Sequence, residues 1–345
     1  MTWLCRTLGC FGLAMVVGYA ALVGFTGSPD LDHPAWAQTK GRVPGSALGN
    51  INDAELWRLV RQGVTGTVSI PDKKAGVLVQ SEGDEWRALR NGPLSEYGWW
   101  AMAAMLVVTA VFFLFRGRIR IDGGFAGRMV RRFTDLEVFT HWLTASSFVV
   151  LALTGLNTLY GKHVLIPVLG KSAFATLTSW GKFAHTYIAF AFILGLLLML
   201  VIWIRHNFPD RYDIGWIAKG GGLFVKGSHP PAGKFNFGQK AIFWITILGG
   251  GAASFTGIIL MFPFTFFGMQ DMQLMQIIHA AVALGMIVVI FGHIYIGTLG
   301  IEGAFSAMST GEVDENWAKH HHSAWAVESE EGQAVPQPPE RQPAE

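Results

Sequence analysis

Five long runs of apolar residues, separated by polar segments, constrain the fold of this chain more than any other feature. They cover residues 97–115, 138–160, 183–204, roughly 241–264 and roughly 273–298. Each is near the ~20 residues that a helix needs to cross about 30 Å of hydrocarbon. Backbone groups in lipid must find hydrogen-bond partners within the protein, which favours helices. The sequence therefore predicts an all-α membrane protein with five transmembrane helices.

The composition supports this interpretation and excludes several other classes of protein. Hydrophobic residues make up 51% of the chain and charged residues 14%, whereas a typical soluble domain has roughly 25% charged residues. The formal net charge of +2 is too small to indicate a nucleic acid as a partner. Cys5 and Cys10 are too few for a disulfide scaffold, a zinc site with cysteine ligands or an iron–sulfur cluster.

The N-terminus has the pattern of a secretory signal peptide over residues 1–37. Arg6 supplies the basic start, residues 8–25 the apolar core, and Ala35-Trp36-Ala37 the small residues of a cleavage site. An uncleaved signal anchor is the alternative, because the spacer before the cleavage site is long. In both cases we expect residues 38–95 to form a periplasmic segment.

The distribution of Lys and Arg between the runs predicts the orientation in a bacterial inner membrane. The expected loops over residues 116–137 and 205–240 hold most of these cations, whereas the opposite loops hold only two (residues 161–178) and none (residues 263–272). The positive-inside rule places the two basic segments in the cytoplasm. The tail over residues 300–345 is then also cytoplasmic, and we expect its polar end to be disordered.

Four histidines lie within or at the edges of the apolar runs, where ionisable residues are costly and usually functional. In the predicted orientation, His141 and His293 lie near the cytoplasmic side, and His185 and His279 near the outer side. His279 and His293 share the fifth run, about 21 Å apart along the axis and on one face to within about 40°. The sequence therefore predicts two pairs at two depths, His185 with His279 and His141 with His293.

Two histidines on facing helices at equal depth can supply both axial ligands of a haem iron. The two pairs therefore predict two haems stacked across the membrane, which would form an electron path. Zinc would require three or four ligands at one depth. A proton relay is the competing function, but it would favour Asp and Glu within the five runs, which contain none.

Glycines and the remaining histidines carry weaker signals. Gly155, Gly249-Gly250-Gly251 and Gly257 allow the close approach either of a porphyrin or of a neighbouring helix, and alone they favour helix packing. His320-His321-His322 in the tail could bind a metal, although a solvated or partner-facing surface is the favoured interpretation. For His163, His206 and His229 the spacing identifies no partner.

Seven motifs give the chain a resemblance to a known family. They are Phe139-Thr140-His141-Trp142, Phe183-Ala184-His185-Thr186, Ile278-His279-Ala280-Ala281, Gly292-His293-Ile294-Tyr295, Arg205-His206-Asn207-Phe208-Pro209-Asp210, Lys234-Phe235-Asn236-Phe237-Gly238-Gln239-Lys240 and Trp317-Ala318-Lys319-His320-His321. With them, the chain resembles the gamma, cytochrome b subunit of membrane-bound formate dehydrogenases, densely over residues 128–326. Shorter members of that family have four spans. The resemblance therefore implies a four-helix haem-binding bundle with one extra N-terminal transmembrane helix, which has no assigned role.

The resemblance implies a complex of three kinds of subunit. A molybdenum or tungsten catalytic (alpha) subunit oxidises formate, an iron–sulfur (beta) subunit carries the electrons, and this chain anchors both and passes electrons through two haems b to menaquinone or ubiquinone. It also implies that Asn236, Gly238 and Gln239 contact the quinone beside His293. Amide side chains and an open glycine backbone suit a quinone carbonyl. A segment that simply caps the fourth span is the alternative for these three residues.

These expectations divide the chain into four parts and leave other functions open. We expect a signal peptide (1–37), a periplasmic segment (38–95), a five-helix di-haem cytochrome b domain (96–299) and a cytoplasmic tail (300–345). No residue could itself oxidise formate, so the chain would be the electron-transfer subunit of the enzyme. The alternatives are the cytochrome b subunit of a membrane nickel–iron hydrogenase or of a thiosulfate or polysulfide reductase, and a non-redox membrane anchor.

Overall fold

The computed structural model describes residues 81–225 and 227–327. Five helices in this part of the chain are long and apolar enough to cross a membrane, and each corresponds to one of the predicted runs. The all-α membrane fold is therefore confirmed. Residues 1–80, which include the expected signal peptide and most of the expected periplasmic segment, and residues 328–345 lie outside the described residues. The five helices are α4 (Ser95–Arg116), α5 (Asp135–Val164), α6 (Ile166–Trp203), α8 (Phe237–Met261) and α9 (Met269–Tyr295).

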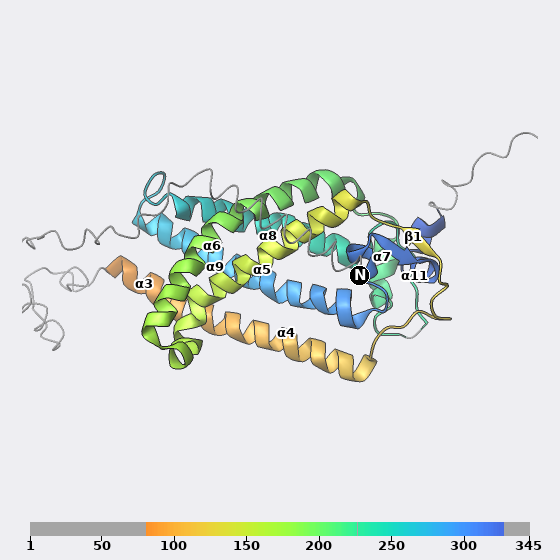
Figure 1. The fold of residues 1–345 in the computed structure, drawn as a ribbon, viewed down its shortest axis with the longest axis horizontal. Coiled ribbons are helices and arrows are strands. Elements are labelled where there is room, and N and C mark those ends of the chain that lie inside the picture. The colour runs from red at the N-terminus through yellow and green to blue at the C-terminus, as the bar shows by residue number, and fades with distance from the viewer. Residues whose placement is uncertain (1–80, 226, 328–345) are drawn as a thin grey trace, which may run out of the picture.

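The long helices run along the longest axis of the molecule (Figure 1). α5 packs against α6, α6 against α8, and α8 against α9, and α9 also contacts α5. These four helices form the bundle that holds all four membrane histidines. α4 lies against α9 on the outside of this bundle.

Reciprocal side-chain caps set the start of two bundle helices. At α5, the Thr134 hydroxyl accepts a hydrogen bond from the Glu137 backbone N–H at 3.3 Å, and the Glu137 carboxylate accepts one from the Thr134 N–H at 2.8 Å. Asn236 and Gln239 make the same exchange at the start of α8. Such capping boxes satisfy backbone donors that a helix leaves unpaired at its N-terminus. Both helices therefore begin a few residues before their apolar runs.

Residues 161–178, which we expected to form a loop between two spans, are almost entirely helical. α5 continues to Val164, and α6 begins at Ile166. Within α6, Gly170 has a φ of 77° and a ψ of 168°, where the chain bends between two helical stretches. The expectation was wrong because hydropathy marks where a chain leaves the apolar layer. Polar residues can continue a helix beyond that point.

The extra helix α4 is joined to helical structure on its N-terminal side. α3 (Ser81–Leu89) and the short π-helix η2 (Arg90–Leu94) precede it, so the end of the expected periplasmic segment runs directly into the first span. The Tyr160 hydroxyl of α5 donates a hydrogen bond to the Ser95 carbonyl at 2.7 Å. Met102 is buried in a cluster with residues of α5 and α9. α4 is thus packed on the bundle.

The first part of the tail folds back against one end of the bundle, which the sequence did not predict. β2 (Glu312–Asp314) pairs antiparallel with β1 (Met129–Arg131), and Val313 is fully buried. The Asp314 carboxylate accepts hydrogen bonds from the Ala126, Gly127 and Asn316 N–H groups. Figure 1 shows α7, β1 and α11 together at this end, which we call the tail end. The remaining elements are η3 (Ile204–His206), α7 (Asp213–Ala218), η4 (Gly220–Gly222), η5 (Ile296–Gly300), α10 (Ser306–Ser309) and α11 (Glu315–His321).

Arg132, one of the cations that predicted the orientation, is buried at the tail end. Its guanidinium lies 5.0–5.2 Å from the ring centroids of Phe133, Trp317 and Trp325, in the range of cation–π contacts. It donates a hydrogen bond to the Lys234 carbonyl at 2.6 Å. Burial lowers the pKa of Arg132 to about 9. This cation therefore holds the tail on the bundle.

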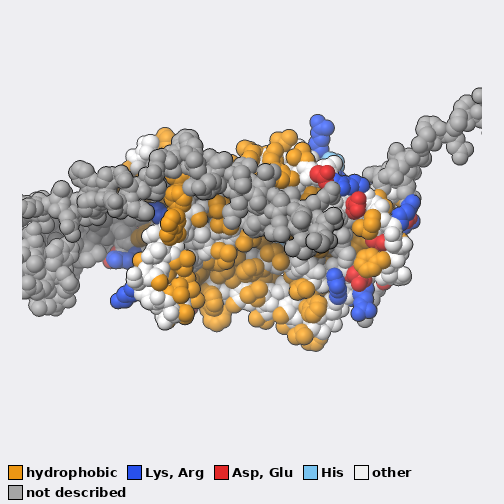
Figure 2. Space-filling view, viewed as in Figure 1, with side chains coloured by type: hydrophobic (Ala, Val, Ile, Leu, Met, Phe, Trp, Pro, Cys, Tyr) orange, Lys and Arg blue, Asp and Glu red, His pale blue; other side chains and the backbone are white. Residues whose placement is uncertain are grey.

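The surface agrees with a membrane location. Figure 2 shows hydrophobic side chains gathered over the bundle, whereas the charged side chains lie toward its two ends. Large apolar residues on the long helices remain exposed, among them Leu114 at 80% and Val201 at 75%. Large exposed apolar patches are rare on soluble monomers. The chain is a multi-pass membrane protein.

Candidate functional site

The structure brings the four membrane histidines together in the two predicted pairs. His185 on α6 and His279 on α9 have ring centroids 6.1 Å apart, with the ring planes at 66°. His141 on α5 and His293 on α9 have ring centroids 6.2 Å apart, with the planes at 53°. Because α9 supplies one member of each pair, the pairs lie at two positions along the bundle.

These separations fit two imidazoles that share one metal ion. A ring nitrogen lies about 1.1–1.2 Å from the ring centroid, and a metal–imidazole bond is about 2.0 Å long, so two trans imidazoles have centroids about 6.3 Å apart. The observed values of 6.1 Å and 6.2 Å are close to this separation. Each pair therefore fits a haem iron, which its two histidines would hold.

The hydrogen bonds of His279 define which of its ring nitrogens has a lone pair available to a metal ion. Its Nδ1 lies 3.0 Å from the Ala253 carbonyl oxygen, which can only accept, so Nδ1 carries the proton. The Thr256 hydroxyl lies 3.0 Å from the same nitrogen and donates its own proton to the Ala252 carbonyl at 2.8 Å. The lone pair of His279 is therefore on Nε2, the usual arrangement of a metal-binding histidine whose other nitrogen is hydrogen-bonded.

His185 has the same arrangement on the facing helix. Its Nδ1 lies 2.8 Å from the Thr154 hydroxyl oxygen, and that hydroxyl donates its proton to the Val150 carbonyl at 2.7 Å. The threonine oxygen therefore accepts from the His185 Nδ1–H. Both rings of this pair are oriented by a threonine on a neighbouring helix, a detail that the sequence analysis missed. Both threonines lie more than about three helical turns from the nearest motif and give no sequence signal.

Two of the predicted glycines face this histidine pair, and two others serve helix packing. A Cβ at Gly155 would lie 3.6 Å from Cε1 of His185, and one at Gly257 would lie 3.3 Å from Cε1 of His279. At Gly249 and Gly250 an added Cβ would instead meet side chains of α9 and α6 at about 3 Å. The helix-packing interpretation is therefore confirmed at Gly249 and Gly250, whereas Gly155 and Gly257 lie beside the histidine rings.

The other histidine pair lines a large cavity at the tail end of the bundle. The cavity has a volume of about 1180 Å³, and both His141 and His293 contribute to its wall. A typical ligand pocket measures roughly 300–1,000 Å³. The His141 Nδ1 is buried and has no hydrogen-bond partner among the described residues. The cavity is therefore large enough for more than one small ligand.

The three residues expected at a quinone site line the same cavity. Asn236, Gly238 and Gln239 lie at the start of α8, on the wall shared with His293. The Asn236 side-chain oxygen accepts from the Gln239 N–H at 2.9 Å, and the Gln239 side-chain oxygen accepts from the Asn236 N–H at 3.1 Å. The capping alternative is thus present in the structure. It occupies only the oxygens and leaves both side-chain NH₂ groups free to donate.

His322 and Arg132 form a buried contact on the tail side of this cavity. The His322 Nδ1 donates to the Gly233 carbonyl at 2.8 Å, and its Nε2 lies 3.1 Å from an Arg132 nitrogen, which donates. Burial, followed by the Arg132 charge, lowers the pKa of His322 well below the usual value. Since His322 is 1% exposed, the favoured interpretation of His320-His321-His322 as a solvated or partner-facing surface was wrong for this residue.

Comparisons with known proteins give one family match and several similar proteins. Residues 132–311 match the family model described as prokaryotic cytochrome b561. Among curated proteins, the chain is 30% identical over 213 residues to the cytochrome b556(Fdn) subunit of the nitrate-inducible formate dehydrogenase of Escherichia coli K12, covering 60% of this chain and 94% of that protein. It is 29% identical to the cytochrome b556(fdo) subunit of the same organism, over 56% of this chain and 90% of the relative. A formate dehydrogenase cytochrome b556 subunit of Haemophilus influenzae is 31% identical, over 57% and 82% respectively.

Proposed function

Because the chain belongs to the prokaryotic cytochrome b561 family and is similar to the cytochrome b subunits of formate dehydrogenase, we propose that it carries electrons from formate oxidation to a quinone. The family implies haem b as the cofactor. The observation that carries the proposal is the presence of two histidine pairs with ring centroids 6.1 and 6.2 Å apart. Two haems b per chain, one per pair, account for both separations.

His185 and His279 would hold one haem, and His141 and His293 the other. Haem supplies one-electron oxidation and reduction when it is bound. Thr154 would keep the Nε2 lone pair of His185 available to the iron by accepting a hydrogen bond from Nδ1–H. The helices around the pairs would surround the haems with apolar side chains. The chain would thus supply ligands, their orientation and apolar surroundings at two positions along the bundle.

A quinone would bind in the cavity beside His293. The NH₂ groups of Asn236 and Gln239 would donate hydrogen bonds to a quinone carbonyl, and Gly238 would let the ring approach the backbone. A Cβ at Gly238 would lie 3.1 Å from the Trp216 ring, so glycine makes room for Trp216, which lines the same cavity. Because His293 lines the same cavity, the quinone would lie next to one of the two histidine pairs.

The remaining expectations complete the proposal. The tail end carries the basic segments 116–137 and 205–240, so it would face the cytoplasm of a bacterial cell and the His185–His279 pair would lie toward the periplasm. The partners would be an iron–sulfur subunit and a molybdenum or tungsten catalytic subunit, which this chain anchors at the inner membrane. Residues 1–37 would be the signal peptide, 38–95 a periplasmic segment, 96–299 the di-haem domain and 300–345 the cytoplasmic tail.

Absorbance spectroscopy of the purified chain tests this proposal. Reduction with dithionite should give two b-type haems per chain, and removal of the excess reductant followed by a soluble menaquinone or ubiquinone analogue should reoxidise them. A non-redox membrane anchor predicts that the quinone has no effect on haem oxidation. Absence of haem from a properly folded chain would remove the ligand assignment altogether.

A further inference from the structure

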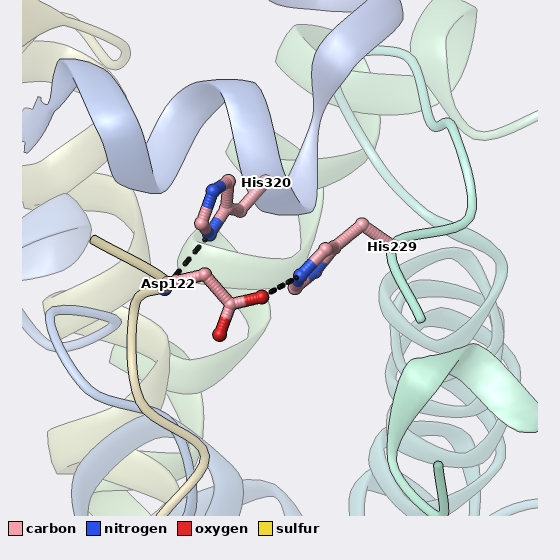
Figure 3. Close-up of side chains that lie close together, drawn as sticks. All are labelled: Asp122, His229 and His320. Carbon is pink, nitrogen blue, oxygen red and sulfur yellow. Dashed lines mark hydrogen bonds and ion pairs between the residues drawn. The ribbon is translucent and has the colours of Figure 1, made fainter. Parts of the chain in front are cut away.

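Three side chains converge at the tail end, outside the two histidine pairs. Asp122 follows α4, His229 lies between α7 and α8, and His320 is on α11. The ligand atoms that these side chains offer all lie within 4.8 Å of one another. Figure 3 shows one nitrogen of each histidine ring directed at Asp122. From this geometry we propose that Asp122, His229 and His320 bind a divalent first-row transition-metal ion such as Zn²⁺.

The donor set is suited to such an ion. Two imidazole nitrogens and one carboxylate oxygen are ligands of Zn²⁺ in proteins, and a site with three protein ligands leaves one position for water. Zinc–ligand bonds of about 2.0–2.1 Å in a tetrahedron separate ligand atoms by about 3.3 Å, so the most distant atoms must approach by at most about 1.5 Å and the His229–Asp122 pair must move apart by about 0.7 Å. Side-chain rotation can supply a movement of this size.

The existing contacts already hold the side chains in facing positions. The His229 Nε2 lies 2.6 Å from the Asp122 carboxylate, and the His229 and His320 rings are stacked with centroids 4.4 Å apart. The Asp122 backbone N–H donates to the His320 Nδ1 at 3.2 Å. Binding of an ion would replace these two hydrogen bonds. The Asp122 side chain is 59% exposed, so the Asp122 backbone N–H could then donate a hydrogen bond to water.

The protonation states of the cluster side chains favour binding of a metal cation over binding of a proton. The hydrogen bond from His229, and then the nearby histidine charges, lower the pKa of the Asp122 carboxyl. Partial burial and the neighbouring His229 lower the pKa of His320. Near pH 7 the cluster therefore offers a carboxylate and a neutral imidazole, the protonation states that metal binding requires.

The backbone around the cluster is fixed by other contacts, so the site is not on free loops. Ile119 pairs with Ile301, and the Ile121 N–H donates to the Glu302 carboxylate, which holds the segment before Asp122. The Trp325 N–H donates to the Ala232 carbonyl three residues after His229. Since all three candidate ligands also line the cavity beside His293, a bound ion would tie the tail to the bundle at the cavity edge. This proposal is independent of haem and quinone binding.

Zinc binding by the full chain in detergent tests the proposal. The protein is purified through a tag without histidines, treated with a chelator and titrated with Zn²⁺ by calorimetry. We expect one Zn²⁺ per chain, with affinity reduced at least about 10-fold in His229→Ala and in His320→Ala. His163→Ala, an exposed histidine in the last turn of α5, is the matched control and should bind like the wild type.

Two further steps distinguish loss of zinc binding from loss of the fold. Gel filtration and circular dichroism check that each variant is folded, and Asp122→Asn, which keeps the side-chain shape, replaces any alanine variant that is not. The proposal is overturned if the wild-type chain does not bind Zn²⁺ at micromolar concentration. It is also overturned if binding survives in both histidine variants, since the ion would then lie elsewhere and the cluster would be a hydrogen-bonded contact only.

Discussion

The Lys234 ammonium nitrogen lies 2.6 Å from the Glu137 carboxylate, although the two residues belong to separate segments at the tail end. The Glu137 side chain is 6% exposed and also accepts a hydrogen bond from the Trp203 indole at 2.8 Å. It caps the start of α5 as well. One buried carboxylate therefore joins α5, the end of α6 and the segment before α8, next to the cavity of the candidate quinone site.

Replacing Glu137 should destabilise the fold strongly. In Glu137→Ala the Lys234 ammonium remains without its partner, and loss of one member of a buried pair costs about 3–5 kcal/mol. Asp135→Ala is the matched control in the same helical turn, because its ion pair with Arg131 is exposed and contributes less than about 1 kcal/mol. Denaturation in mixed detergent micelles measures both. Equal losses for the two variants would contradict the assigned role of Glu137.

Helix packing should depend on Gly195 but not on Gly251. A Cβ at Gly195 would lie 2.4 Å from the Thr144 hydroxyl and 3.1 Å from its Cα, where α6 crosses α5. At Gly251 nothing lies within 4 Å. Gly195→Ala should therefore lower the thermal midpoint, whereas Gly251→Ala should leave it unchanged or raise it, because alanine favours a helix over glycine by about 1 kcal/mol. The reverse order would show that the α5–α6 contact is described wrongly.

Substitution of Thr154 should change the midpoint potential of only one of the two haems. The threonine oxygen accepts from the His185 Nδ1–H, which makes Nε2 a stronger ligand and favours the oxidised iron. Loss of a hydrogen bond of about 0.5–1.5 kcal/mol in Thr154→Val should raise one midpoint potential by roughly 20–60 mV. A redox titration followed by absorbance measures this shift.

The control for this variant is Thr158→Val, one turn further along α5. The Thr158 hydroxyl is exposed and donates only to the Thr154 carbonyl, so neither potential should change. If Thr154→Val shifted both haems equally, or neither, the orientation of His185 by this threonine would have no influence on the cofactor.

Substitutions at the start of α8 can separate helix capping from quinone binding. Asn236→Asp and Gln239→Glu keep the oxygens that form the capping box but remove the two NH₂ donors. Haem content and stability should remain near wild type. Reoxidation of the reduced haems by a quinone should slow by roughly 2- to 10-fold for each hydrogen bond lost. Stopped-flow absorbance after addition of quinone follows the rate.

Two results would decide between the roles of these amides. Wild-type reoxidation rates in both variants would mean that the residues only cap α8. If Asn236→Ala, which loses the cap as well, also reoxidised normally, the quinone would have to bind away from Asn236.

The sequence predicted the helices and the histidine pairs because both depend on regular spacing. Apolar runs of membrane length mark helices, and the depths of His141, His185, His279 and His293 follow from their positions along those runs. The structure places the rings of each predicted pair about 6 Å apart. Such pairing needs no information beyond helix periodicity and topology.

The tail end could not be predicted in the same way. β1 and β2 have three residues each, which is too short for a periodic pattern. They pair although most of the described chain lies between them in the sequence. Arg132 looked like a loop cation, but its burial depends on aromatic residues of the distant tail. The cluster of Asp122, His229 and His320 could not be predicted for the same reason, since these residues come from three separate segments.

The most direct test of the account is the haem content of paired histidine variants, read from reduced-minus-oxidised spectra of the purified chain. Each of His141→Ala, His185→Ala, His279→Ala and His293→Ala should lose one of two haems. The double variant His185→Ala with His279→Ala should lose no more haem than either single variant, because both residues hold the same iron. Combining His185→Ala with His293→Ala should remove both haems. Equal loss in the two double variants, or retention of both haems in any single variant, would contradict the assignment of one haem to each pair.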